Sequence, residues 1–142
     1  MPGVIDFALR RRLREAQAIA DLTGRVGGKP AIDLDERKSN DRSAFSSVVI
    51  TLIAPGRNYD QDGVSSTRQA LFRFEIFSLS ADPGILLKEA LATELQTKPA
   101  AEIEGVRFAA GYVFGDRPGG VDNIGELRVY RRILDMDITA TI

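Results

Sequence analysis

The sequence contains no cysteine and no histidine. Without cysteine, the chain cannot form disulfide bonds, thiolate nucleophiles or zinc sites built on sulfur. Without histidine, it also lacks the commonest general base and metal ligand of enzymes. These absences exclude most classes of enzyme, and we expect a protein without catalytic residues, cofactor or metal site.

Long apolar runs and an excess of charge of one sign are absent as well. No run approaches the roughly 20 apolar residues that span a bilayer, and the segment from Met1 to Phe7 lacks the basic start and apolar middle of a secretory signal. We therefore expect synthesis in the cytoplasm and no membrane partner. Nineteen basic and 20 acidic side chains give a net charge of −1, which provides no general attraction to nucleic acid.

What is present is the composition of an ordinary globular domain. The 142 residues are 44% apolar and 27% charged, and their number is close to the commonest size of a single domain. No repeat, low-complexity run or linker divides the chain. We expect one domain, residues 1–142.

The spacing of the apolar residues predicts six main elements in the order α-β-β-α-β-β. Such an order predicts an α+β fold of two layers, in which two helices cover one face of a largely antiparallel four-stranded sheet. Ala31, Ile32 and Leu34 add a possible short edge strand. The predicted helices are residues 4–22 and 83–97, and the predicted strands are 48–53, 68–79, 106–114 and 127–138.

The strand from Arg68 to Leu79 organises the prediction. Apolar and charged side chains alternate along it with a period of two, which is typical of a strand with one buried face. Asp82 and Pro83 then suit the N-cap and first position of the following helix. The side chains expected to be buried together are those of Val49, Phe72, Phe74, Ile76, Leu91 and Leu95.

The last predicted strand has an inconsistent alternation. Its apolar residues change parity between Val129 and Leu134, so we predict a β-bulge near Arg131 and Arg132. Beyond that bulge, Asp135 and Asp137 are expected side by side on the exposed face.

Two polar segments, Arg57–Thr67 and Gly115–Gly125, are predicted as hairpin loops. Both are longer than the two to five residues usual for hairpins, and such loops are commonly functional. Each carries charges of both signs, so we expect them to contact neighbouring subunits or partners. The candidate interface residues are Arg57, Asp60, Asp62, Asp116, Arg117 and Asp122.

A carboxylate-dependent metal- or ligand-binding domain is an alternative interpretation. Paired carboxylates can serve as catalytic acid and base or bind hard cations through oxygen. The residues available for this are Asp33, Asp35, Asp135 and Asp137, but no recognised ligand spacing surrounds them.

Four short segments carry a resemblance to a known family. They are Leu22–Val26 after the first helix, the buried strand at Val48–Ile50, Arg73–Ser78 leading into the second helix, and Tyr130–Ile138. In their order and spacing the chain resembles the tail-completion or tail-terminator proteins of long-tailed bacteriophages and of phage-like particles such as gene transfer agents.

The resemblance implies a structural protein of the virion. Members of this family form a hexameric ring that caps the tail tube, stops its polymerisation and joins it to the head-tail connector. The implied partners are therefore further copies of this chain, the tail tube protein and the connector or stopper, while DNA passes through the ring without sequence-specific binding. A stopper or a tube subunit is the alternative within the same class.

Overall fold

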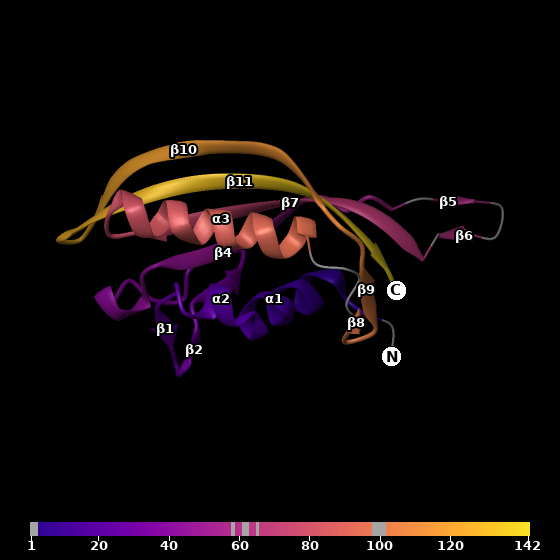
Figure 1. Ribbon diagram of the computed structural model, residues 1–142, viewed down its shortest axis with the longest axis horizontal. Helices are drawn as coiled ribbons and strands as arrows, with labels where there is room; N and C mark the ends of the chain where they lie inside the picture. Colours follow the sequence, from indigo (N-terminus) through magenta and orange to yellow (C-terminus); the bar gives the residue numbers. More distant parts are fainter. Residues whose placement is uncertain (1–2, 58, 61–62, 65, 98–101) are drawn as a thin grey trace.

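The computed structural model describes residues 3–57, 59–60, 63–64, 66–97 and 102–142. β-strands make up the largest share of this part of the chain (Figure 1). The helices are α1 (Ile5–Glu15), α2 (Gln17–Ala20), α3 (Ala81–Thr97) and the short 3₁₀ helix η1 (Arg42–Ala44). The strands are β1 (Arg25–Val26), β2 (Lys29–Pro30), β3 (Ile32–Leu34), β4 (Ser47–Ala54), β5 (Tyr59–Asp60), β6 (Gly63–Val64), β7 (Thr67–Ser78), β8 (Glu102–Ile103), β9 (Val106–Phe108), β10 (Tyr112–Ile124) and β11 (Leu127–Thr141).

One sheet of seven strands dominates the fold. Its order is β3-β4-β7-β11-β9-β8, and β10 pairs with β11. The pairing of β3 with β4 is parallel and all others are antiparallel, so the sheet is mixed. The predicted two-layer α+β fold with a four-stranded antiparallel sheet is therefore wrong. The sheet is larger than predicted because it also contains short edge strands and the polar segment of β10. Neither shows the apolar pattern from which the strands were predicted.

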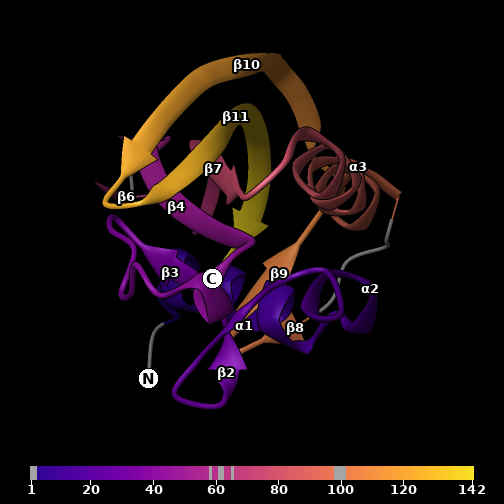
Figure 2. The ribbon, with the colours of Figure 1, turned by 90° about the vertical axis from the view of Figure 1, so that its left-hand side faces the viewer.

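The sheet is strongly curved. β10 and β11 form a long arch beside α3, and a view along the long axis shows β10 bending over β11 and β7 (Figures 1 and 2). Strand twist alone bends long hairpins in this way. Two register shifts in β10, between Val113 and Gly115 and between Pro118 and Gly120, add to the curvature.

The main core lies between the helices and one face of this sheet. Phe72, Phe74 and Ile76 of β7 are completely buried there, as predicted. Leu91 and Leu95 of α3 belong to the same cluster. Val49 is buried but lies outside the cluster, because its neighbours Val48 and Ile50 face the helices instead.

The first helix is shorter than predicted. α1 ends at Glu15 and the single turn of α2 follows, because Ala16 between them is extended, with φ −76° and ψ 107°. Neither proline nor glycine marks this break, so the sequence offered no local signal for it. The break lets both Leu13 and Ile19 be fully buried.

The predicted bulge in the last strand is also in the wrong place. β11 pairs with β7 without interruption from Tyr130 to Thr141, and the irregular positions are in β10. The apolar residues of β11 do change from one side of the strand to the other. This needs no bulge, because both faces of β11 are buried. Ile133 and Leu134 are 7% and 0% exposed, although they face opposite ways.

Candidate functional site

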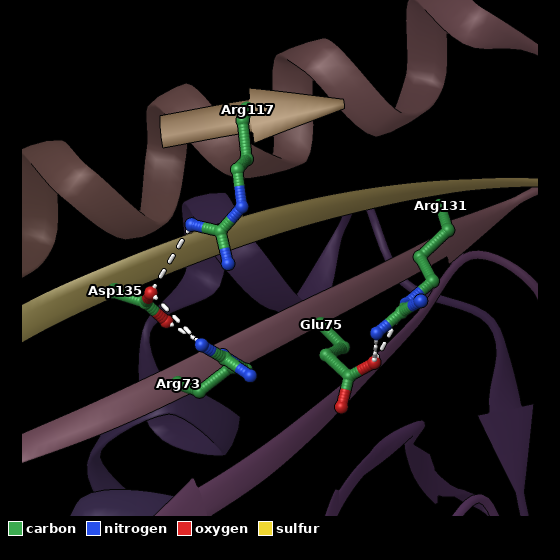
Figure 3. A network of polar contacts seen from close by, with 5 residues as sticks. All are labelled: Arg73, Glu75, Arg117, Arg131 and Asp135. Atoms are coloured by element: carbon green, nitrogen blue, oxygen red, sulfur yellow. Dashed lines mark hydrogen bonds and ion pairs between the residues drawn. The ribbon is translucent and has the colours of Figure 1, made fainter. Parts of the chain in front are cut away.

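A network of charged side chains occupies the sheet face opposite the helices (Figure 3). Arg73 of β7 donates two hydrogen bonds to the carboxylate of Asp135 in β11, at 2.9 and 3.3 Å. Arg117 of β10 donates a third to the same carboxylate, at 3.2 Å. One carboxylate therefore joins three adjacent strands.

Asp135 is only 6% exposed, whereas its arginine partners remain partly solvated. Burial by itself would raise the pKa of Asp135. The hydrogen bonds from Arg73 and Arg117 together outweigh burial and hold this pKa below its usual value. The carboxylate is therefore ionised at neutral pH, and it already accepts three hydrogen bonds from arginines.

A second ion pair lies beside this network. Arg131 of β11 donates a hydrogen bond of 2.7 Å from Nε to Glu75 of β7. Together the two groups carry three arginines against two carboxylates. They cover a sheet face on which Val49 and Ile133, which both pair with Glu75, are also buried. This face is charged but closely packed, unlike the solvated face that was predicted.

Strand β10 is also tied to α3. Lys88 donates a hydrogen bond of 2.9 Å to Asp116, and it is paired with Glu89 on its own helix at the same distance. Lys88 is 8% exposed, and burial lowers its pKa, but the hydrogen bonds from its ammonium group to Asp116 and Glu89 raise the pKa above the usual value. Neighbouring residues of β10 thus fix the strand to both layers, Asp116 to the helix and Arg117 to β11.

The outer edge of β10 is open. Within the described part of the chain β10 pairs with β11 alone, so its other row of backbone groups has no strand partner. Tyr112, Val113 and Phe114 at its start are 66%, 40% and 71% exposed. An apolar edge strand is a surface to which another chain can add.

A cavity of about 250 Å³ lies at one end of the molecule, between the start of α1 and strands β4 and β7. Arg57 and Arg68 line it, and among the described residues that line it Asp6 alone is acidic. The Nε of Arg68 is buried and has no hydrogen-bond partner among the residues that the structure describes.

The six predicted interface residues have different surroundings. Asp116 and Arg117 form the ion pairs already described, so they hold the subunit together. Asp122 is exposed near the end of β10, and Arg57 is exposed at the cavity. Asp60 belongs to β5 but its side chain, like all of Asp62, lies outside the described residues.

The segment 115–125 is therefore a strand and not the predicted loop. It pairs with β11 from Gly115 onward, and only Gly125 and Glu126 form the turn between Ile124 and Leu127. The segment 57–67 contains a small ribbon of β5 and β6, which pairs with no other strand that the structure describes.

The four candidate carboxylates are not brought together. Asp33 of β3 accepts a hydrogen bond of 3.1 Å from Arg14, and Asp35 is exposed after that strand. Strands β4 and β7 separate them from Asp135 and Asp137 of β11. The described residues contain no cluster of three or more acidic side chains that could hold a metal ion, and none of their helices could span a membrane.

Two features of the surface were missed by the sequence prediction. The strand from Val106 to Phe114 was expected to be continuous, with alternate residues buried. Residues 109–111 interrupt it, so Tyr112–Phe114 begin a new strand at an edge. The unpaired Arg68 had no signal in the sequence, because an arginine at the start of a strand is usually solvated.

No protein-family model matches the sequence, and no curated protein matches it. Solved structures do match the fold. A chain in the structure of a native gene transfer agent virion superposes with a TM-score of 0.61 over 97% of this chain and 95% of the other, at 12% identity. The two chains share a fold.

A second solved chain supports the same arrangement. It superposes with a TM-score of 0.51 over 94% of this chain and 92% of the other, at 13% identity. Both matches cover nearly the full length of each chain. At these identities the likeness is one of fold.

Proposed function

We propose that this protein is a structural subunit of a phage-like virion, and specifically the tail-terminator or tail-completion subunit. In this role it forms a hexameric ring on the head-proximal end of the tail tube and joins the tube to the head-tail connector. DNA passes through the ring without sequence-specific contacts. The subunit works in the assembled particle, as part of the tail.

The observation that carries the proposal is the full-length likeness to a chain of the gene transfer agent virion. It is independent of the short sequence segments that resemble tail terminators, since the fold was matched at 12% identity. The fold likeness therefore supports a virion protein. The terminator role within the virion rests on the sequence resemblance.

The surface of the subunit suits such a role. A closed ring of identical subunits requires one patch to meet a different patch on the next copy. The open edge of β10, with exposed Tyr112 and Phe114, is one such patch. On the other edge of the sheet, β3 pairs only with Val48–Ile50 of β4, so the end of β4 pairs with β7 on one side and with no described strand on the other.

The test is deletion of the gene from a particle-producing strain, followed by electron microscopy. Loss of a terminator is expected to give filled heads without tails together with free tubes of irregular length. Restoring the wild-type chain should restore joined particles of uniform tail length.

The alternatives within the particle give different images. Loss of a tube subunit would leave no tubes at all, and loss of a stopper would leave tubes of normal length beside heads that have lost their DNA. Averaging of the tail end in wild-type particles should show sixfold symmetry at this protein, and any other symmetry contradicts the ring. Particles of normal form and yield without the protein would contradict a virion role altogether.

A further inference from the structure

The cavity at the start of α1 contains positive groups that the described part of the subunit leaves unpaired. Arg57 and Arg68 form no ion pair with a residue that the structure describes, and Arg68 Nε is both buried and without a hydrogen-bond acceptor. A buried guanidinium N–H without an acceptor is rare in folded proteins, since it has lost its water without replacement. An acceptor from outside the subunit would satisfy it.

The start of α1 adds to this positive character. Val4 is the N-cap of the helix and its side chain provides no hydrogen bond to the first turn. A helix N-terminus attracts negative charge, and Asp6 alone partly meets that attraction here. The groups that converge on the cavity are thus mainly donors and positive charges.

The remaining wall is apolar, so the ligand should join a negative group to an apolar one. Arginine binds a carboxylate strongly through paired N–H groups. A protein segment that places an acidic side chain beside aliphatic ones fits both parts of the wall. The apolar residues that line the cavity are Val4, Ile5, Leu52, Pro55, Ala70 and Phe72.

The chain itself carries such a segment at its opposite end. The β10–β11 hairpin ends at the turn of Gly125 and Glu126, and both Asp122 and Glu126 are exposed there, against one basic side chain, Arg128, which lies over the ring of Tyr130. Val121 beside them is 44% exposed. The hairpin end and the start of α1 lie at opposite ends of the long axis (Figure 1).

We propose that the cavity of Arg57 and Arg68 receives the acidic end of the β10–β11 hairpin from a second copy of this chain. Each subunit then offers an acidic apolar tip at one end and a basic apolar cavity at the other, which is a head-to-tail contact. Such a contact is heterologous, and it closes into a ring when the angle between copies allows. The inference rests on the proposed function, because it supplies a contact for that ring.

The test uses the absence of cysteine in the sequence, so that any introduced pair gives an unambiguous disulfide. The first species carries Val4→Cys, which lies at the cavity, and the second carries Asn123→Cys, which is exposed next to Asp122. Both substitutions leave the charged groups of the contact in place. The matched control species replaces Asn123→Cys with Ala18→Cys, an exposed neutral position in α2.

The full-length species are mixed and oxidised, and the disulfide-linked dimer is followed on non-reducing gels. Val4 with Asn123 is expected to link several-fold faster than Val4 with Ala18, and added salt should reduce the difference because it screens the charges. Arg68→Glu in the first species should lower the rate to that of the control. Arg57→Glu, at an exposed side chain, should do the same, and it keeps the test valid if Arg68→Glu fails to fold.

Equal linking rates for the two cysteine pairs would overturn the contact. It would also be overturned if neither arginine substitution changed the linking rate of the Val4 and Asn123 pair. The same cysteine pair in assembled particles separates the two proposals. A sixfold ring in which Val4 and Asn123 do not link contradicts this contact and leaves the ring intact. Linkage in solution by a protein that is absent from particles contradicts the virion role and leaves the contact intact.

Discussion

Asp135 holds β7, β10 and β11 together through Arg73 and Arg117, so its carboxylate should contribute to stability. Asp135→Asn keeps the size of the side chain and removes the charge that both arginines neutralise. We expect a loss of about 1–3 kcal/mol in the free energy of unfolding, as for other hydrogen bonds to charged groups. Urea denaturation measures it, with Asp137→Asn on the same strand as the control, which should change stability by less than about 0.5 kcal/mol.

The same carboxylate should give stability a dependence on pH. Its pKa is lower in the folded protein than in the unfolded chain, where the pKa of an aspartate is about 3.9. The stabilisation by Asp135 is therefore fully present at pH values above the pKa of the unfolded chain. It is lost as the pH falls through the pKa of the folded protein. Between about pH 5 and pH 2, stability should fall less steeply in Asp135→Asn than in the wild type. Parallel curves for the two proteins would contradict this role.

Phe74 tests the assignment of the sheet faces. Its side chain is completely buried between β7 and the helices, so Phe74→Ala should cost about 3–5 kcal/mol through lost burial and the cavity left behind. The matched control is Arg107→Ala, since the side chain of Arg107 is 68% exposed. A cost below about 1 kcal/mol for Phe74→Ala in thermal or urea unfolding would show that the ring is not part of the core.

Individual residues were predictable where burial alone decides their position. The alternation of Phe72, Phe74 and Ile76 with charged residues was enough to identify their face of β7. Arg117 and Asp135 were predicted as exposed groups, but they are 18 positions apart in the sequence and meet only because β10 pairs with β11. No local pattern can show such a partnership, since it depends on the register of two strands.

Strand β10 and the ribbon of β5 and β6 should respond differently to shortening. Deletion of residues 115–118 removes the contacts of Asp116 with Lys88 and of Arg117 with Asp135. We expect it to cost at least about 2 kcal/mol. Deletion of residues 59–64 removes a ribbon that pairs with no other described strand, so stability should change by less than about 0.5 kcal/mol.

The ribbon deletion also tests the interface prediction for the segment that begins at Arg57. Particles carrying the shortened chain should fail to join tails to heads, although the purified protein melts normally. Joined particles at normal yield would show that this segment is an ordinary connection. The deletion in β10 cannot serve the same purpose, because it disturbs the sheet itself.

The failure to predict β10 has a physical cause. Its middle, from Gly115 to Gly120, consists of small, polar and proline residues that are typical of turns. Most side chains of β10 are exposed on both faces of the strand, so its sequence need not alternate apolar and polar residues. The strands β4, β7 and β11 and the helix α3 were correctly recognised since each buries a regular face in the core.

The assembled particle is where the exposed residues of β10 should matter. Phe114→Glu places a charge on a side chain that is 71% exposed, so the free subunit should keep its melting temperature. If this edge meets a neighbour, the buried charge would weaken the contact and joined particles would become rare. Leu86→Glu on α3, at a side chain 58% exposed, is the control and should leave joining unchanged. Equal yields from both variants would exclude the β10 edge from the interface.

The position of β11 determines when the subunit can fold during its synthesis. This strand lies inside the sheet, where it pairs along its length with β7 on one side and with β10 on the other. Phe74 of β7, for example, pairs with Leu134, which is translated 60 residues later, after α3 and β10. Pairing over such a sequence distance is slow and leaves apolar strands uncovered in the nascent chain. A ribosome that stops before residue 127 releases a chain without this strand, and such a chain cannot complete the sheet that β7 and β10 share with β11.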